Sequence, residues 1–327
     1  MDGRAAQPLM AIENLGIRFG GAQGPRIIDG VSLVLNKGET LGIVGESGCG
    51  KSILSLSVLG LLPDGARITE GSISLEGQNL STLSPRALRA LRGNQISMVF
   101  QEPMTALNPV LSVGSQLAEV FRTHRGASRK EARQMAVEAL RAVGVASPET
   151  RIRAYPAQLS GGMRQRVMIA MALACHPKIL IADEPTTALD VTIQAQILDL
   201  MRSLRKDFDT SILFISHDLG VIAEVSDRVA VLYSGVVVEE APTAEIFDNP
   251  RHPYTRGLLE ALPQPDTETL PDMLFEIPGT VPPPEARPSG CRFHPRCPIA
   301  TDRCRAEEPP IVEIAPAHRV ACWEARA

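Results

Sequence analysis

The sequence contains no long hydrophobic run, and its first residues do not resemble a leader peptide. Its longest apolar run, Val167 to Cys175, has nine residues and stops at His176, whereas a helix needs roughly 20 to span a bilayer. The first ten residues carry Asp2 and Arg4 and lack the apolar core of a signal peptide. We therefore expect a chain without a membrane span that resides in the cytoplasm.

An excess of charge of one sign is also missing. The chain has 33 basic and 37 acidic residues and a net charge of −4, so its bulk surface offers no electrostatic basis for binding nucleic acid or an anionic membrane. Any such partner must be recognised locally. The 327 residues, of which 44% are hydrophobic, suffice for one large or two modest globular domains.

A glycine-rich loop is the strongest motif in the chain. It fits the phosphate-loop pattern G-x-x-x-x-G-K-[ST] and reads Gly45-Glu46-Ser47-Gly48-Cys49-Gly50-Lys51-Ser52. In this pattern the glycines let consecutive N–H groups face a phosphate, Lys51 places a cation against the β- and γ-phosphates, and the Ser52 hydroxyl can ligate Mg²⁺. A buried strand expected over 41–44 and a helix expected over 52–62 supply the context that the motif requires.

Further strands are expected on both sides of this loop. Residues 11–19 and 26–35 predict paired strands, and Phe19 at the end of the first can either stack on a base or simply pack. Strands over 71–75 and 96–100 follow, and the second ends at Gln101. Because open α/β sheets bind ligands at the carboxyl ends of their strands, Gln101 is either a candidate ligand or a solvated surface residue.

The pattern becomes helical between Glu102 and about Arg153, where Ser128-Arg129-Lys130-Glu131 forms a capping box. We interpret this stretch as an inserted helical subdomain. A Ser-Gly-Gly sequence at 160–162 then precedes an almost wholly apolar helix that runs through Ala174. Such a start either forms an anion site at the positive end of the helix dipole or is an ordinary N-cap.

Two later strands end in polar residues with catalytic potential. The strand expected over 179–184 is buried and ends in Asp183 and Glu184, and exposing two carboxylates there is costly unless a cation or a reaction uses them. Asp183 suits Mg²⁺ coordination and Glu184 suits polarising a nucleophilic water. The strand over 211–215 leads to His217, although a lone histidine after a strand is more often structural.

The final third begins with ordinary elements and then changes in character. A helix is expected over 192–205 and two short strands within 228–240, whereas sixteen of the 26 prolines lie from Pro242 onward. We expect this tail to be a loop-rich extension with little regular structure of its own. A segment of that kind needs packing on the main body or a staple to be ordered.

Four of the six cysteines are crowded into the tail. They are Cys291, Cys297, Cys304 and Cys322. In a reducing compartment clustered cysteines indicate a metal site before a disulfide, and Cys297-Pro298 is similar to the Cys-Pro found beside some iron–sulfur clusters. Zinc is the alternative, with His294 or His318 available, although the paired C-x₂₋₄-C spacing is missing. Free thiols are the third possibility.

Taken together, these motifs resemble the nucleotide-binding subunits of ABC transporters. The resemblance covers Ala11 to about Glu240. In order, the motifs are residues 45–52 as Walker A, Gln101 as the Q-loop, Leu159-Ser160-Gly161-Gly162-Met163-Arg164-Gln165 as the signature, residues 179–184 as Walker B, Ala188-Leu189-Asp190 as the D-loop, and His217 as the switch histidine. Cys49, where Walker A often has Ser, and Met163, where the signature commonly has Gln, are mild departures that remove no charge.

The resemblance implies a fold and a domain division. The fold is an α/β P-loop NTPase core of the RecA-like type, with an antiparallel β subdomain, a helical subdomain at about 102–160 and a loop-rich C-terminal extension. The nucleotide-binding domain would span residues 1–245 and the extension residues 246–327. It further implies a head-to-tail dimer in which ATP lies between Walker A of one subunit and the signature of the other.

The same resemblance implies roles for individual residues. Phe19 would stack on adenine, residues 45–52 and Ile53 would surround the nucleotide, and Lys51 would contact the phosphates. Ser52, Gln101 and Asp183 would bind Mg²⁺. Glu184 would act on the attacking water and His217 would contact the γ-phosphate, so that electrostatic positioning supplies most of the catalysis.

Additional motifs resemble the ATPase subunits of oligopeptide, dipeptide and nickel importers. They are the segment Phe100 to Pro109, residues 162–166, His252-Pro253-Tyr254-Thr255 and the cysteine-rich tail. The resemblance implies a second, similar ATPase, two permeases, an extracytoplasmic binding protein and a location on the cytoplasmic face of the cell membrane. Similar tails are associated with a [4Fe–4S] cluster. Dipeptides, longer peptides, glutathione and nickel are not separated as substrates by the sequence.

Two alternatives from other functional classes are weaker. A soluble ABC ATPase of DNA repair or translation predicts a tandem second cassette or a basic nucleic-acid face, and the sequence has one cassette and a net charge of −4. A non-catalytic regulatory module that binds nucleotide and senses redox state predicts a degraded Walker B or switch residue. Glu184 and His217 are both present.

Overall fold

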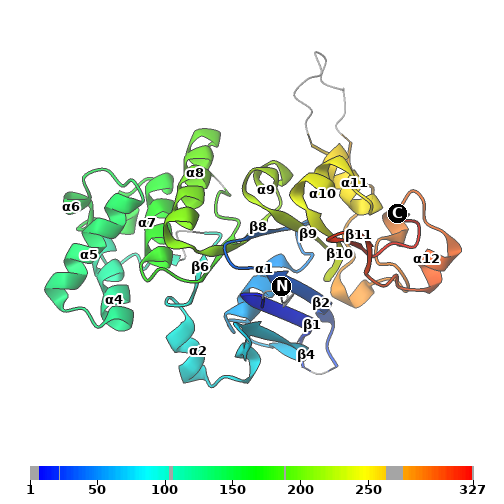
Figure 1. Cartoon of the computed structure of the whole chain (residues 1–327), viewed down its shortest axis with the longest axis horizontal. Helices are drawn as coiled ribbons and strands as arrows, with labels where there is room; N and C mark the ends of the chain where they lie inside the picture. The colour runs from blue at the N-terminus through cyan, green and yellow to red at the C-terminus, as the bar shows by residue number, and fades with distance from the viewer. Residues whose placement is uncertain (1–6, 22, 103–105, 188, 263–274, 326–327) are drawn as a thin grey trace, which may run out of the picture. The chain divides into compact units, whose positions relative to one another are not determined.

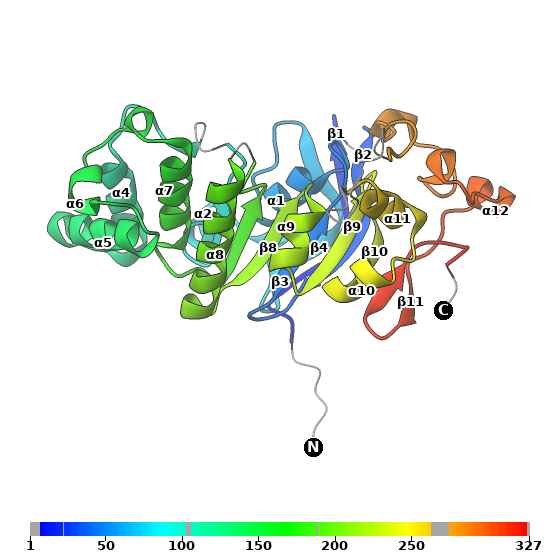
Figure 2. The ribbon, with the colours of Figure 1, turned by 90° about the horizontal axis from the view of Figure 1, so that it is seen from above.

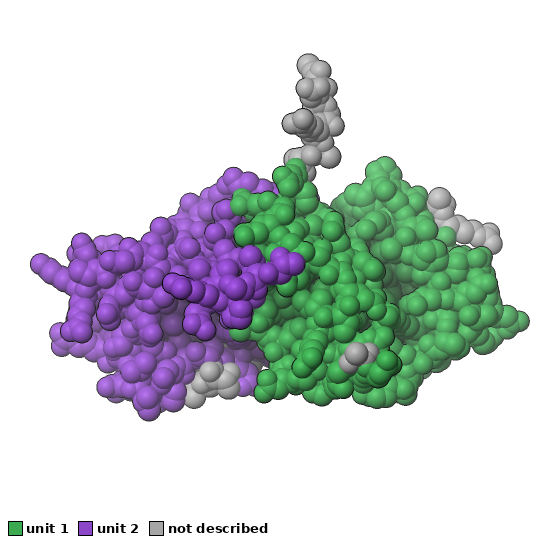
Figure 3. All heavy atoms as spheres, turned by 90° about the horizontal axis from the view of Figure 1, so that it is seen from below, with its two compact units in different colours: residues 1–35, 40–81, 216–327 green, residues 36–39, 82–215 purple. Residues whose placement is uncertain are grey.

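The computed structural model of the chain describes residues 7–21, 23–102, 106–187, 189–262 and 275–325. The chain forms two compact units, which Figure 3 distinguishes by colour. Unit 1 consists of residues 1–35, 40–81 and 216–327, and unit 2 consists of residues 36–39 and 82–215. Each unit therefore combines segments that are far apart in the sequence. Within the described ranges, no helix is both long and apolar enough to cross a membrane.

Unit 1 contains a four-stranded antiparallel sheet with the order β2-β1-β4-β5, and its three long strands lie side by side in Figure 1. Its strands are β1 (Met10–Phe19), β2 (Arg26–Leu35), β4 (Ala66–Leu75) and β5 (Gln78–Asn79). In β2 the residues Val31, Leu33 and Leu35 are buried while the residues between them are exposed. This alternation fixes which face of the strand packs into the core and confirms the paired strands expected from the sequence.

A second sheet in unit 1 carries the phosphate loop. Its order is β11-β12-β10-β9-β3, with β3 parallel to β9 and the other pairs antiparallel. The strands are β3 (Thr40–Val44), β9 (Arg228–Tyr233), β10 (Val236–Pro242), β11 (Val312–Ala315) and β12 (His318–Val320). All five residues of β3 are buried, as expected for a strand covered on both faces.

The helices of unit 1 are short. They are α1 (Lys51–Val58), α9 (Leu219–Val225), α10 (Thr243–Asp248), α11 (Pro253–Glu260) and α12 (Asp302–Ala306), with 3₁₀ turns at Leu80–Thr82, Pro284–Ala286 and His294–Arg296. α1 ends earlier than the expected residue 62, because Gly60 takes a left-handed conformation (φ 61°) and the Leu61 N–H turns back to the Leu56 carbonyl.

The tail has more regular structure than the sequence predicted. The expectation of little regular structure beyond Pro242 is wrong in part, because α10, α11 and α12 form there and the β11–β12 hairpin adds to the edge of β10. The hydrophobic pattern of the sequence did not indicate the β11–β12 hairpin, because β11 is largely exposed and the two strands have only four and three residues. Pairing with β10 supplies the backbone hydrogen bonds that make such short strands stable.

Unit 2 combines a parallel sheet of order β8-β7-β6 with a group of helices. The strands are β6 (Ile96–Val99), β7 (Ile179–Asp183) and β8 (Ser211–Ser216). The helices are α2 (Pro85–Leu91), α4 (Val113–Arg125), α5 (Arg129–Ala142), α6 (Pro148–Arg151), α7 (Gly161–Leu173) and α8 (Val191–Phe208), with a 3₁₀ turn at Pro156–Gln158. Figure 2 shows α4, α5, α6 and α7 gathered together.

The helical part of unit 2 confirms two sequence predictions. The side chain of Ser128 accepts the N–H of Glu131 (3.3 Å) and the carboxylate of Glu131 accepts the N–H of Ser128 (2.9 Å), which is the expected capping box. The apolar helix after residues 160–162 is α7. α8 is three residues longer at its carboxyl end than the expected helix over 192–205 and stops where Asp209 takes a left-handed conformation (φ 51°).

A buried carboxylate ties the tail to the sheet of unit 1. Glu239 on β10 is fully buried and accepts the backbone N–H groups of Arg251 (2.7 Å) and His252 (2.9 Å). The Nε2 atom of His318 on β12 lies 2.7 Å from the same carboxylate. A buried carboxylate is tolerated only when its oxygens are hydrogen-bonded, so these three partners together connect α11 and the C-terminal hairpin to β10.

We predict that Glu239→Gln lowers the free energy of unfolding by about 3 kcal/mol, because hydrogen bonds to a buried charged group are lost and an amide N–H₂ is turned toward donors. Urea denaturation of the full chain measures this value. The matched control is Glu307→Gln, which removes an ion pair to Arg303 whose side chains are both more than half exposed and should cost less than about 1 kcal/mol. Equal losses in the two variants would contradict the role assigned to Glu239.

His252 predicts a pH dependence of stability. Its Nδ1 accepts the N–H of Tyr254 (3.0 Å) at the start of α11, and burial lowers its pKa from 6.5 to about 3. In the unfolded chain the ring takes a proton below about pH 6.5, whereas the folded chain resists it, so this contribution to stability is complete above pH 6.5 and is lost as the pH falls toward 3. His252→Asn keeps an acceptor for the Tyr254 N–H. Its unfolding free energy should therefore fall less steeply between pH 6.5 and pH 4.5 than that of the unaltered chain, and parallel curves would contradict the argument.

Candidate functional site

The phosphate loop, residues 45–52, connects β3 to α1 in unit 1 and requires glycine for steric reasons. A side chain on Gly45 would collide with the carbonyl oxygen of Leu232 on β9. Gly50 has φ 107°, and a Cβ there would lie 2.7 Å from the Cδ1 atom of Ile28. Only a glycine tolerates both the left-handed backbone and these close approaches, so the neighbouring strands fix the conformation of the loop.

Lys51 occupies the interior of this loop. Its side chain is nearly buried, and its Nζ donates to the carbonyl oxygens of Gly45 (2.6 Å) and Glu46 (3.1 Å). The neighbouring Cys49 thiol is buried, which raises its pKa despite the nearby Lys51 cation. Ser52 is exposed at the start of α1 and Ile53 is half-buried. The arrangement places one ammonium group at the centre of the loop.

Two side chains from the tail contact the loop, and the sequence analysis had not assigned either to it. The Tyr254 hydroxyl accepts the backbone N–H of Glu46 (2.9 Å). The guanidinium of Arg296 donates to both carboxylate oxygens of Glu46 (2.7 and 3.0 Å). Tyr254 belongs to the His252–Thr255 motif, but Arg296 had no signal in the sequence because its partner is 250 positions away.

The other predicted residues of unit 1 lie on its surface. Phe19 is 45% exposed at the end of β1, beside the backbone of Gly65, so its ring has an accessible face. His217 is exposed between β8 and the Asp218 side chain that caps α9. Both positions leave the aromatic rings accessible to a ligand.

In unit 2 the structure brings Gln101 and Glu184 together. The Glu184 carboxylate accepts the Gln101 amide N–H (2.9 Å) and the Thr187 hydroxyl (2.9 Å). Glu184 has φ 47°, a backbone conformation that residues other than glycine rarely adopt. Its backbone N–H donates to the carbonyl of Ile215. Asp183 before it is buried at the end of β7. The strained backbone turns the carboxylate of Glu184 out of the sheet.

The signature segment, residues 159–165, forms the start of α7. Ser160 is the N-cap and accepts the N–H of Met163 (3.3 Å), so the amides of the first turn stand at the positive end of the helix. Buried Gln165 donates to the carbonyl of Pro185 (2.5 Å). This bond connects the signature helix to the segment that follows Glu184. A Cβ on Gly162 would lie 2.8 Å from Ile193, so its lack of a side chain lets α8 approach.

Asp190 of the D-loop is the N-cap of α8, and its side chain accepts the N–H of Ile193 (3.0 Å). This is a structural role that the sequence analysis had not predicted. Ala188 of the same loop, and residues 103–105 of the segment Phe100 to Pro109, lie outside the described residues.

The four cysteines of the tail line one pocket in unit 1, together with the side chains of His252, Phe293 and Trp323. None is in a disulfide. Burial and the neighbouring thiols raise the pKa of Cys291 to about 11. Across the described part of the chain, however, no three His, Cys, Asp or Glu side chains are placed to hold a metal ion. The finding gives no support to the expected metal site.

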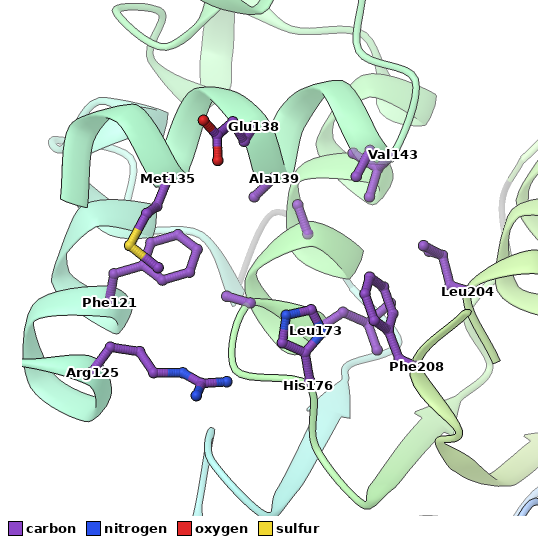
Figure 4. A pocket seen from close by; sticks show the side chains of 13 residues that line it. Phe121, Arg125, Met135, Glu138, Ala139, Val143, Leu173, His176, Leu204 and Phe208 are labelled. Atoms are coloured by element: carbon purple, nitrogen blue, oxygen red, sulfur yellow. The ribbon is translucent and has the colours of Figure 1, made fainter. Parts of the chain in front are cut away.

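A larger hollow lies among α4, α5, α7 and α8 in unit 2 (Figure 4). Its wall is mostly apolar, with Phe121, Met135 and Leu173, and the rings of His176 and Phe208 are 4.2 Å apart at one side. None of the residues predicted from the sequence to bind nucleotide lines it. It is therefore separate from the candidate site.

Comparison with known proteins gives the family. The description "ABC transporter" matches residues 28–187 and "Oligopeptide/dipeptide transporter, C-terminal region" matches residues 238–304. The chain is 51% identical to an oligopeptide transport ATP-binding protein of Bacillus subtilis over 317 residues, and 46% identical to a dipeptide transport ATP-binding protein of Escherichia coli over 315 residues. These alignments cover 96% of each chain.

Solved structures agree with this result. A dimeric ATP-binding cassette in a post-hydrolysis state, bound to ADP and phosphate, matches with a TM-score of 0.64 and 30% identity, covering 72% of this chain and 98% of its own. The expected P-loop ATPase fold is thus confirmed. The chain belongs to the ATP-binding subunits of ABC transporters, in the group that carries the oligopeptide/dipeptide transporter C-terminal region.

Proposed function

We propose that this chain hydrolyses ATP to drive the import of peptides. The observation that carries the proposal is the Glu184 carboxylate, which a strained backbone and two hydrogen bonds, from Gln101 and Thr187, hold beyond the end of β7. A carboxylate fixed in this way is suited to accept a proton from an attacking water. The peptide class is supported by the C-terminal region match and by the names of the full-length relatives.

The residue roles follow the chemistry of each group. We infer that the phosphate loop and Lys51 bind the triphosphate, that Phe19 stacks on the base, and that His217 contacts the γ-phosphate. The first-turn amides of α7 and the Ser160 hydroxyl would bind the phosphates from a second subunit. In this arrangement the protein supplies positioning and charge rather than covalent chemistry.

Ser52, Gln101 and Asp183 are the residues that would hold Mg²⁺. They offer a hydroxyl, an amide oxygen and a carboxylate, which is a donor set of hard oxygen atoms of the kind that Mg²⁺ prefers. When bound, the ion would neutralise charge on the β- and γ-phosphates.

We propose that the chain works as part of a membrane complex. The partners would be a second ATPase subunit of related sequence, two permeases and an extracytoplasmic binding protein, with this chain at the cytoplasmic face of the cell membrane. The likeness to a cassette solved as a dimer supports the paired arrangement. The relatives' names favour peptides over nickel or glutathione as the cargo, and they oppose a role in DNA repair or translation.

A division near residue 245 is also proposed, with the nucleotide-binding domain over 1–245 and the extension over 246–327. The two family matches, 28–187 and 238–304, support it. The extension is nevertheless packed into unit 1 through β12 and Glu239, so we expect it to fold with the nucleotide-binding domain and not alone.

We further propose that Cys291, Cys297, Cys304 and Cys322 hold a [4Fe–4S] cluster, as the tail of the family implies. All four thiols line one pocket and none is oxidised, and a cluster of this type takes four cysteine ligands. A cluster binds each cysteine through a different iron, so it needs a wider set of sulfurs than a single zinc ion does. The described residues hold no three His, Cys, Asp or Glu side chains placed for a metal ion, so the choice between a cluster, zinc and free thiols rests on the metal analysis given below.

We predict that Glu184→Gln binds ATP as the unaltered chain does but hydrolyses it at least about 100-fold more slowly, because a general base contributes factors of that order. Binding is measured with radiolabelled ATP and hydrolysis by phosphate release in the assembled importer. Glu119→Gln, at an exposed position on α4, is the matched control and should hydrolyse normally. Hydrolysis by Glu184→Gln at the normal rate would show that another group activates the water.

For the cysteine pocket we predict about four iron and four sulfide per chain after anaerobic purification, with visible absorption, and loss of both in Cys297→Ser. Metal analysis of the same sample distinguishes zinc. The control is Cys175→Ser, since Cys175 is buried in unit 2 away from the tail cysteines. A protein with neither iron, sulfide nor absorption would contradict the cluster.

A further inference from the structure

Glu46 places a carboxylate within the phosphate loop. If residues 45–52 hold the triphosphate, as proposed above, the carboxylate of Glu46 belongs to the same loop as the bound anion. Like charges repel, and solvent screens this repulsion less when the groups are partly buried. Only 31% of the Glu46 side chain is exposed. The charge therefore needs a local partner if the loop is to favour an anionic ligand.

Arg296 supplies that partner from the tail. Its two terminal nitrogens reach both oxygens of Glu46, at 2.7 and 3.0 Å, in a forked geometry that matches a carboxylate. The Arg296 side chain is only 4% exposed. Burial disfavours the charged form of Arg296, but the hydrogen bonds to Glu46 and the negative charge of Glu46 outweigh burial. The pKa of Arg296 is therefore raised above its usual value. Arg296 therefore places a positive charge directly beside the Glu46 carboxylate.

The guanidinium of Arg296 is itself fixed in place. It also donates to the carbonyl oxygens of Pro278 (2.8 Å) and Ile277 (3.2 Å), and its carbon lies 5.8 Å from the centre of the Tyr233 ring. The two Glu46 oxygens, the two carbonyl oxygens and the face of the Tyr233 ring together restrict the Arg296 guanidinium to one position. An arginine held this rigidly also fixes where the Glu46 carboxylate can lie.

Tyr254 holds the backbone of the same residue. Its hydroxyl accepts the Glu46 N–H at 2.9 Å, and burial raises the pKa of Tyr254, so the hydroxyl is neutral. The ring packs against Tyr233, with centroids 4.6 Å apart, and against Phe293, at 5.4 Å. One side chain of the tail therefore fixes the main chain of Glu46, and another neutralises its carboxylate.

We propose that Arg296 and Tyr254 are positioning residues of the phosphate loop, and that the nucleotide affinity of this ATPase depends on its C-terminal region through them. Arg296 removes the repulsion between Glu46 and the triphosphate, and Tyr254 keeps the start of the loop in its binding conformation. The inference rests on the proposed role of residues 45–52. Arg296 directly precedes Cys297, so the cysteine pocket and the phosphate loop are joined through adjacent residues.

If Arg296 acts by neutralising Glu46, removal of the Glu46 charge should restore nucleotide binding to an Arg296 variant, which a purely structural role of Arg296 does not predict. The purified full chain is titrated with a non-hydrolysable ATP analogue and Mg²⁺, and the dissociation constant is compared among variants. Arg296→Gln should weaken binding on the order of tenfold, which corresponds to about 1.4 kcal/mol. Glu46→Gln should bind at least as tightly as the unaltered chain. The double variant should return to within about twofold of Glu46→Gln, because no carboxylate is left to neutralise.

Two further variants complete the design. Arg305→Gln removes an exposed ion pair with Asp302 in the same tail and should leave the dissociation constant unchanged. Tyr254→Phe keeps the packed ring but removes the acceptor of the Glu46 N–H, and should weaken binding about threefold with the thermal midpoint lowered by a few degrees at most. If Arg296→Gln does not fold, Arg296→Lys keeps the charge and should bind within about threefold of the unaltered chain.

Several outcomes would overturn the inference. Unchanged binding by Arg296→Gln, a double variant as weak as Arg296→Gln, or a tenfold loss in Arg296→Lys would each show that neutralisation of Glu46 is not what the loop requires. Lys51→Ala separates this result from failure of the proposed function. If Lys51→Ala binds the analogue normally, residues 45–52 are not the nucleotide site. If Lys51→Ala loses binding while Arg296→Gln keeps it, only the positioning role is wrong.

Discussion

A phosphate-binding loop must keep its backbone in one conformation although most of its residues have small side chains or none. The loop at 45–52 meets this constraint through its neighbours: β9 blocks any side chain at Gly45, Ile28 blocks one at Gly50, and the turn after β9 donates the Gly235 N–H to the carbonyl of Cys49. The shape of the loop is thus determined by β2, which precedes it in the sequence, and by β9, which follows it by nearly 200 residues.

Residues of the C-terminal tail also stabilise the strands and the turn that surround the phosphate loop. Arg292 donates to the carbonyl of Ser234 beside Gly235 (2.8 Å) and pairs with Asp29 on β2 (2.5 Å). Together with the contacts of Glu239, these bonds hold the last part of the chain against β2, β10 and the turn between β9 and β10. Buried charges of this kind are individually expensive and are tolerated because each has several partners. The proline-rich composition of the tail is consistent with this, since its order comes from such contacts more than from regular structure.

In unit 2 the position of the Glu184 carboxylate is likewise fixed by its neighbours. The carboxylate follows a strand whose five residues are all buried, and the left-handed backbone of Glu184 turns it toward Gln101 and Thr187. The signature helix is linked to the next residues through Gln165 and Pro185. This hydrogen bond directly connects α7 to the residue that follows Glu184.

The order of the motifs along the chain indicated the family. The sequence by itself also determined local features, namely the glycine pattern of the loop, the buried strands expected over 179–184 and 211–215, and the capping box at Ser128. Each depends on residues within a few positions of one another, where backbone sterics and hydrophobic periodicity act. Only the tertiary structure decided what Arg296, Tyr254 and Glu239 do, and that the C-terminal hairpin joins β10. Their partners lie between 12 and 250 positions away, and no local pattern encodes a hydrogen bond between residues that only the folded chain brings together.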